Sequence, residues 1–231
     1  CVVSSQDTRL LIDCGTTHRY LKQSLGKLDL NIEDLDALLI THDHSDHTRQ
    51  VKMFKDHLIY SPVDLEVQSK RVYPYEAFAL GTFTILPIRT SHDAEISVGY
   101  VLDDGMHRLV YITDTGYIRE KDYPLISNAD FYVLESNHDP SLLMKTNRPY
   151  TIKRRILSES GHLSNEQSAS ILSEVVGEKT KEVFLAHLSE EANTEGLAYE
   201  TVRAALPKTI DVFVARQHEM VFGGKIDEGS F

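Results

Sequence analysis

The chain has 231 residues, of which 41% are hydrophobic and 26% charged, and its formal net charge is −11. This length and composition fit one compact domain, and no apolar run approaches the roughly 20 residues that a membrane-spanning helix needs. The negative charge argues against a protein that coats nucleic acid non-specifically, because such binding depends on many phosphate contacts. We therefore predict a single domain, residues 1–231, with no membrane-embedded role.

The two cysteines, Cys1 and Cys14, are too few for a disulfide framework, and neither belongs to a CxxC pair that would bind zinc. This cysteine usage favours a reducing compartment, and we predict a cytoplasmic protein. Because the chain begins with Cys1 rather than Met, we expect it to start inside its natural reading frame.

The first half of the chain is expected to be rich in strands. Short apolar runs bounded by turn residues predict strands at RLLIDCG (9–15), ALLIT (37–41), HLIYS (57–61) and FTILPI (83–88), and a hairpin from SVGYVL to HRLVYIT with its turn at 103–105. Helices are predicted between them, near 17–25 and 46–56.

The second half alternates strands and helices. The predicted order is a strand at FYVLES (131–136), a basic irregular segment, a helix at 165–176, a strand at 182–187, a helix near 194–205 and a strand at 210–215. Ser164 and Gln167 have capping-box spacing at the start of the first helix, and Gly177 is a natural stop. The mixture predicts a layered α/β protein with substantial antiparallel pairing.

The most unusual stretch is THDHSDH (41–47), with three histidines and two aspartates in seven positions. On a helix, His42 and His44 would diverge by about 200°, so both can face one site only from a strand end or loop. Asp46 and His47 follow at once, which gives more ligand-type groups than one tetrahedral zinc with an open position needs, and this favours a two-metal site. The plain alternative is an exposed polar turn. Asp43 is expected to point away from the histidines.

Further candidate ligands follow predicted strands in the same way. Asp13, His92, Asp114 and His187 each come at or just after the end of an apolar run. Each alone would be an ordinary strand-end residue. Because strand ends are where rigid elements converge side chains on a shared site, the repeated placement predicts one common centre.

This pattern resembles the metallo-β-lactamase superfamily. The resemblance covers essentially the whole chain and implies a four-layer αββα sandwich with two divalent metal ions. It implies His42, His44 and His92 on one metal, Asp46, His47 and His187 on the second, and Asp114 bridging both. Asp13 would orient a ligand loop, although it could instead cap the following helix. Zinc, manganese and iron all accept such donors. Members usually have a Gly-rich first strand ahead of the cysteine, so an N-terminal strand is expected to be truncated.

Three later segments indicate the chemistry. ESNHD (135–139), RPYTIKRRI (148–156) and SGHLSNEQSA (160–169) resemble the YycJ/WalJ/VicX subgroup, regarded as bacterial 5′→3′ DNA exonucleases, and GHLSN is similar to the RNase Z branch. The resemblance implies that His162 assists phosphodiester cleavage; a packing role at a helix start is the alternative. His138 could make either a structural hydrogen bond or a substrate contact.

Phosphate contacts are expected next to His162. Ser164 and Asn165 open a predicted helix, whose free N–H groups favour anions. No acid occurs between Asp139 and Glu159, whereas this interval holds five basic residues, Lys145, Arg148, Lys153, Arg154 and Arg155. Arg154 and Arg155 are candidates to hold a phosphate, although a solvated surface is equally common.

The predicted function is metal-dependent phosphodiester hydrolysis, most simply by a 5′→3′ exonuclease on DNA, with Asp46 taking the proton of the attacking water and His162 acting as general acid. One alternative is a small-molecule hydrolase of the same fold, a nucleotide phosphodiesterase or glyoxalase-II-like thioesterase, which the net charge of −11 favours. Another is a non-catalytic regulator of a two-component system. The expected partner is DNA with a 5′ end, and the oligomeric state is open.

Overall fold

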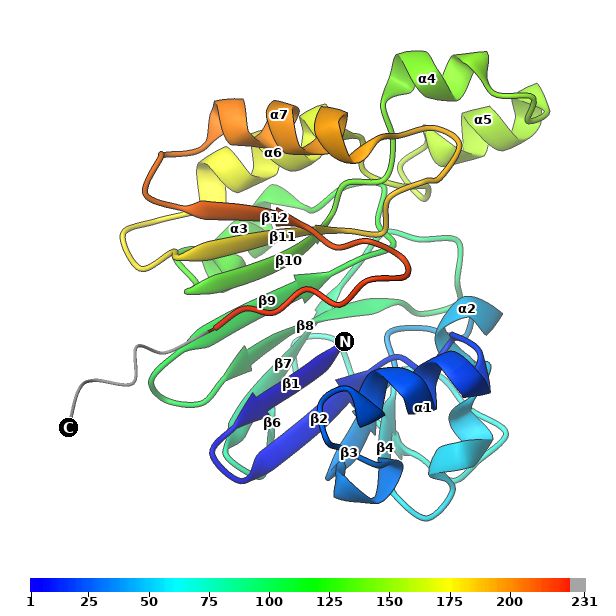
Figure 1. The fold of residues 1–231 in the computed structure, drawn as a ribbon, viewed down its shortest axis with the longest axis vertical. Helices are drawn as coiled ribbons and strands as arrows, with labels where there is room; N and C mark the ends of the chain where they lie inside the picture. Colours follow the sequence, from blue (N-terminus) through cyan, green and yellow to red (C-terminus); the bar gives the residue numbers. More distant parts are fainter. Residues whose placement is uncertain (225–231) are drawn as a thin grey trace. The chain divides into compact units, whose positions relative to one another are not determined.

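The computed structural model describes residues 1–224 (Figure 1). The chain divides into two compact units, the first Cys1–Met106 and the second beginning at His107. Within the described residues, no helix is both long enough and apolar enough to cross a membrane.

The first unit contains a five-stranded sheet in the order β1-β2-β3-β4-β5. The first pair is antiparallel and the other pairs are parallel. Its strands are β1 (Val2–Ser5), β2 (Thr8–Ile12), β3 (Ala37–Leu39), β4 (Leu58–Ser61) and β5 (Lys70–Arg71). The near-continuous apolar runs of β2 and β3 are typical of parallel strands that are covered on both faces.

Short helices pack on this sheet. They are α1 (His18–Gly26), α2 (Ser45–Thr48) and the 3-10 turns η1 (Ile32–Asp34) and η2 (Val51–Phe54). Leu21 and Leu25 of α1 and Phe54 of η2 join one buried cluster with Leu11 and Leu38 of the strands. The helix predicted near 46–56 is therefore wrong in detail, because two short helical pieces form there instead of one helix.

A second set of strands in this unit is antiparallel. It contains β6 (Phe78–Leu80), β7 (Phe83–Arg89) and β8 (Val98–Asp103) in that order. The Tyr100 hydroxyl donates to Ile40 O at 2.6 Å, and Val98 N–H donates to Thr41 O at 3.0 Å. These bonds fix the chain directly ahead of His42.

The second unit contains four parallel strands in the order β9-β10-β11-β12. They are β9 (Arg108–Ile112), β10 (Phe131–Glu135), β11 (Glu182–Ala186) and β12 (Asp211–Val214). Helices α6 (Asn165–Val175) and α7 (Glu195–Ala205) lie side by side over one face of these strands (Figure 1). The turn η3 (Glu120–Asp122) and the short helix α3 (Tyr123–Ile126) precede β10.

Most predicted elements are confirmed, including the Ser164–Gln167 capping box, in which Gln167 N–H donates to Ser164 Oγ and Ser164 N–H donates to Gln167 Oε1. Both strands of the predicted hairpin form as β8 and β9, and Gly105 takes φ +86° in the turn. Positive φ at that position is what glycine tolerates best.

The basic segment after β10 is not irregular, contrary to the prediction. It forms α4 (Pro140–Lys145) and α5 (Tyr150–Ile156). Asp139 caps α4 by accepting from Leu142 N–H, and the buried Lys153 ammonium donates to Met144 O and Thr146 O, each at 2.7 Å. The Lys153 side chain thus caps carbonyl groups at the C-terminal end of α4 and is not part of the basic surface.

Candidate metal centre

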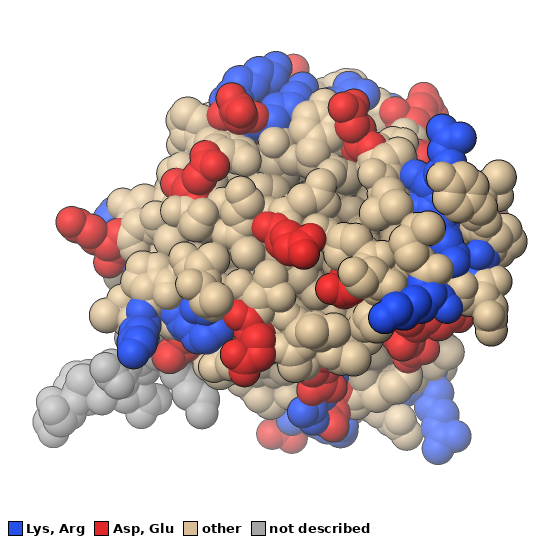
Figure 2. Space-filling view, turned by 90° about the horizontal axis from the view of Figure 1, so that it is seen from above, with Lys and Arg blue, Asp and Glu red and all other residues tan. Residues whose placement is uncertain are grey.

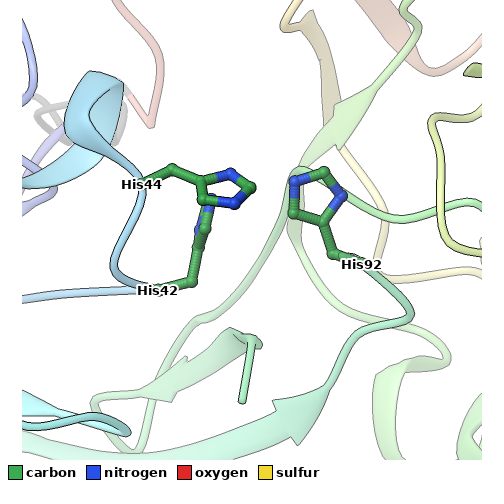
Figure 3. A group of neighbouring side chains, drawn as sticks. All are labelled: His42, His44 and His92. Carbon is green, nitrogen blue, oxygen red and sulfur yellow. The ribbon is translucent and has the colours of Figure 1, made fainter. Parts of the chain in front are cut away.

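Three histidines of the first unit converge on one point. His42 and His44 lie in the loop between β3 and α2, and His92 follows β7. One ring nitrogen from each lies within 4.8 Å of those of the other two, and the three side chains point toward one another (Figure 3). Ring centroids are 4.5 to 5.1 Å apart. Three convergent imidazoles fit a divalent transition metal such as zinc.

Asp46 and His47 lie beside this cluster on α2. The buried His47 ring lies 4.1 Å from that of His42, centroid to centroid, and the mostly exposed Asp46 carboxylate approaches His47 Nε2 at 3.8 Å. Asp93 also approaches the cluster, with Oδ1 3.3 Å from His92 Nε2 and 3.9 Å from His44 Nε2. The sequence reasoning missed Asp93; its position directly after His92 was the available signal.

Asp13 fixes the backbone and one imidazole of this loop. Its Oδ1 accepts from Thr41 N–H at 2.9 Å, and its Oδ2 accepts from the Thr41 hydroxyl at 2.9 Å and lies 2.7 Å from His47 Nδ1. Burial raises the pKa of Asp13, but the charge of His47 and the hydrogen bonds from His47 and Thr41 outweigh it, so the pKa lies below its usual value. An ionised Asp13 therefore holds His47 Nδ1 and leaves Nε2 for a ligand.

We expect Asp13→Asn to weaken metal binding about 10- to 100-fold, the usual effect of losing a carboxylate behind a ligating histidine. The amide removes the charge that orients His47 but keeps the side-chain shape. Competition with a chromophoric chelator measures the affinity. Asp43→Asn is the matched control, because Asp43 is an exposed aspartate of the same loop. Equal affinities for wild type and Asp13→Asn would remove the orienting role.

The second unit brings its candidate residues together through strand register. Leu134 of β10 pairs with Ile112 of β9, and Glu135 pairs with Ala186 of β11. Asp114 follows β9 and His187 follows β11, so both come at the same carboxyl edge as Glu135. Asp114, Glu135, His162 and His187 each offer a ligand atom within 4.8 Å of the others.

Glu135 is the centre of this second set. Its Oε1 lies 2.7 Å from His162 Nδ1 and 3.0 Å from His187 Nδ1, while Oε2 accepts from Thr115 N–H at 2.9 Å. Burial raises the pKa of this fully buried carboxyl, but the hydrogen bonds and charges of the two histidines lower it to about 2. Glu135 is therefore ionised at neutral pH and acts on both imidazoles at once.

The sequence reasoning missed Glu135. The available signal was its position as the last residue of the strand FYVLE, the same placement that singled out Asp114 and His187. Asp114 Oδ1 lies 3.2 Å from His187 Nε2 and 3.9 Å from His162 Nδ1. His187 therefore has a carboxylate at each ring nitrogen, Glu135 at Nδ1 and Asp114 at Nε2.

Three of the strand-end candidates have left-handed backbone conformations. The φ angles are +59° at Asp13, +54° at Asp114 and +59° at His187. This region is uncommon for residues other than glycine and is enriched at functional sites. The left-handed turn at each strand end bends the chain where a candidate ligand occurs.

The predicted phosphate-binding residues divide into two kinds. Ser164 and Asn165 are buried and bonded internally: Ser164 Oγ accepts from Gln167 N–H, and the Asn165 amide exchanges hydrogen bonds with Asn193 at 2.9 Å. A phosphate contact by either side chain would have to displace one of these bonds. Arg154 and Arg155, by contrast, are exposed on α5.

His138 is fully buried, and neither of its ring nitrogens has a hydrogen-bond partner among the described residues. Burial lowers its pKa to about 4. In the unfolded chain His138 binds a proton below about pH 6.5, whereas in the folded chain it does so only below about pH 4. The free energy of unfolding therefore falls as the pH drops from 6.5 to 4.

We expect His138→Leu to flatten this acid dependence. Removing one such titration lowers the slope of the unfolding free energy against pH by up to about 1.4 kcal/mol per unit between these pKa values. Urea denaturation of metal-stripped protein at several pH values measures the slope, with the exposed His18→Leu as control. Identical slopes for wild type and His138→Leu would contradict the neutral, buried imidazole.

Residues 8–188 match the family described as the beta-lactamase superfamily domain. Among curated proteins, the chain is 31% identical over 222 residues to exodeoxyribonuclease YycJ of Bacillus anthracis, covering 88% of this chain and 83% of the relative. It is 33% identical over 211 residues to exodeoxyribonuclease WalJ of Streptococcus pneumoniae, covering 84% and 78%.

Solved structures show the same fold. The metallo-beta-lactamase fold protein YhfI of Bacillus subtilis matches with a TM-score of 0.70 at 23% identity, covering 93% of this chain and 87% of that one. Human tRNase Z, short form, matches with a TM-score of 0.65 at 16% identity, covering 94% and 89%. These matches confirm the predicted fold and resemblance. The chain therefore belongs to the metallo-beta-lactamase superfamily of metal-dependent hydrolases.

Proposed function

We propose that the chain is a metal-dependent 5′→3′ exonuclease that hydrolyses DNA. The observation that carries this proposal is the pair of His162 Nδ1 and Glu135 Oε1 at 2.7 Å, with Asp114 Oδ1 3.9 Å from the same nitrogen. This pair fixes the His162 imidazole beside Asp114, a candidate metal ligand. An imidazole in that place can protonate the alkoxide that leaves when a phosphodiester is cleaved. The names of YycJ and WalJ as exodeoxyribonucleases support DNA as the substrate.

The donor set fits divalent metal ions. The three imidazoles of the first unit and the carboxylate–imidazole group of the second are mixed N and O donors that zinc, manganese and iron accept. The proposed ligands are those that the superfamily pattern implies: His42, His44 and His92 for one ion, Asp46, His47 and His187 for the other, with Asp114 shared. When bound, two such ions lower the pKa of a water and polarise a phosphoryl oxygen.

Side chains of the protein donate a proton to the leaving oxygen and accept one from the attacking water. Ionised Glu135 accepts from His162 Nδ1–H and so fixes the ring orientation, and in the doubly protonated imidazolium the second proton, on Nε2, is the one that the leaving 3′ oxygen takes. Asp46, whose carboxylate is mostly exposed, accepts the proton of the attacking water. Arg154 and Arg155 hold the backbone or the 5′-terminal phosphate.

The proposal is tested with purified protein loaded with Mn²⁺ or Zn²⁺ and with metal-stripped protein. The substrates are linear DNA, RNA, a cyclic nucleotide and a glutathione thioester. Metal-dependent cleavage of DNA is expected. Activity on the thioester or cyclic nucleotide without cleavage of any polymer would instead establish the small-molecule hydrolase that the charge of −11 favours. Absence of bound metal after loading would establish the non-catalytic regulator.

A further inference from the structure

Helices α4 and α5 present an unusual surface that combines basic and apolar side chains. We define the α4–α5 surface as the exposed residues Met144, Tyr150, Ile152, Arg154, Arg155 and Leu157. Although the chain carries a net charge of −11, no acid occurs at residues 140–158. Figure 2 shows Lys and Arg side chains gathered over these helices, beside uncharged surface.

Three of these residues form one stripe. Tyr150 and Arg154 of α5 and its C-cap residue Leu157, which keeps a right-handed helical backbone, follow one another at i, i+4 and i+7, so they lie on the same side. Tyr150 is 65% exposed, the highest value for any tyrosine among the described residues, and Leu157 is 47% exposed. An aromatic ring, a guanidinium and an aliphatic side chain thus lie in line, open to solvent.

The stripe rests on a rigid base. Leu143 of α4, Ile156 of α5 and Ala192 form a small buried cluster. The buried Lys153 ammonium ties the middle of α5 to the end of α4 through its bonds to Met144 O and Thr146 O. A prearranged surface loses little side-chain entropy on binding, so exposed rings and guanidinium groups here can give affinity.

The same helix leads directly into the loop of His162. The His162 N–H donates to Ile156 O at 3.0 Å, and Gly161 N–H donates to Ser158 O at 2.9 Å. A Cβ on Gly161 would come within 2.2 Å of Ile156 O and 2.3 Å of Arg155 O, so only glycine fits this close turn. The end of α5 and the imidazole of His162 are therefore held in one arrangement.

We propose that the α4–α5 surface binds single-stranded DNA, with Tyr150 stacking on a base and Arg154 contacting the adjacent phosphate. This inference rests on the proposed nuclease function and adds the form of the substrate. Single strands expose base faces that stack on aromatic side chains, whereas a duplex hides them, so Tyr150 gains little from duplex DNA. A second copy of this chain is a poorer occupant, because a symmetric contact would bring the guanidinium groups of both copies together.

Binding is measured on the metal-loaded protein with a 5′-phosphorylated, phosphorothioate-linked oligothymidylate, by fluorescence anisotropy. Tyr150→Ala is expected to weaken binding about tenfold, within the range found for loss of one base–aromatic stack. Tyr150→Phe keeps the ring and the affinity. Arg154→Gln is expected to lower the slope of log K against log salt by about 0.7, the value of one single-strand phosphate contact.

Tyr199→Ala is the matched control, because Tyr199 is an exposed tyrosine on another helix, α7. Circular dichroism of each variant shows that the fold is kept. The inference is overturned if Tyr150→Ala binds the single strand like wild type, or if it weakens duplex binding equally. It is also overturned if sedimentation shows that Tyr150→Ala abolishes a dimer and leaves DNA binding intact.

The two proposals fail in different ways. If the wild-type protein binds single strands through Tyr150 but cleaves no DNA, the nuclease function is overturned, while the α4–α5 surface remains a single-strand binding site. If the protein cleaves DNA but binds single strands independently of Tyr150, only the proposed role of the α4–α5 surface is overturned.

Discussion

Replacing His162 by Ala is expected to lower DNA turnover about 10²- to 10⁴-fold, the usual contribution of general acid–base catalysis. Glu135 Oε1 lies 2.7 Å from His162 Nδ1 and orients the imidazole, so the ring is in position to donate a proton. The variant loses the proton donor for the leaving oxygen but none of the proposed metal ligands. Two metal ions per chain are therefore expected to remain, as measured by plasma emission spectrometry.

A pH–rate profile separates catalysis from a structural role. Loss of the acid removes the basic limb of the profile, whereas a variant that is merely less stable keeps the profile at reduced amplitude. The control is His218→Ala, an exposed histidine outside both clusters. Unchanged turnover in His162→Ala would exclude His162 from the mechanism.

Replacing His92 by Ala is expected to remove one of the two metal ions and nearly all DNA hydrolysis. His92 supplies one of three nitrogens that lie within 4.8 Å of one another, and the two imidazoles that remain hold a divalent ion more weakly than three. The loss of affinity should exceed the 10- to 100-fold expected for Asp13→Asn, because a direct ligand is lost rather than its support.

The metal content is measured after dialysis against a weak chelator, with His18→Ala, an exposed histidine of the first unit, as control. If His92→Ala retains both ions and full activity, the three-histidine site is wrong. A variant that keeps both ions but is inactive would place His92 in catalysis rather than in metal binding.

Much of this site was predictable because the ends of apolar runs in the sequence indicate where strands end. Apolar runs end at Ile12, Ile112 and Ala186, and a polar side chain of ligand type follows each within two residues. Ile112 and Ala186 end parallel strands of one sheet, so the residues that follow them meet at one edge of that sheet. Asp114 and His187 could therefore be grouped from the sequence pattern.

Glu135 and Lys153 show where such reasoning fails. Glu135 closes its strand like the others, but only the fold reveals that one carboxylate serves both His162 and His187. Lys153 sits in a run of basic residues that looks uniformly solvated, yet its ammonium is turned inward to cap α4. Side-chain direction on a short helix depends on tertiary contacts that sequence spacing does not encode.

The buried amides were unpredictable for a related reason. Asn165 opens a well-capped helix, which in sequence favours anion binding. In the fold, its side chain bonds to Asn193 and accepts from the Ser136 hydroxyl at 2.7 Å, contacts 28 and 29 residues away in the chain. Such long-range pairing decides whether a polar residue faces a substrate or stabilises the loops around it.

The direction of DNA hydrolysis can be measured by digesting a single-stranded oligonucleotide, labelled at either end, with the metal-loaded protein. For 5′→3′ hydrolysis we expect a 5′ label to be released at once as a mononucleotide, while a 3′ label remains on progressively shorter fragments. Immediate release of the 3′ label, or persistence of both labels on intact DNA, would contradict it.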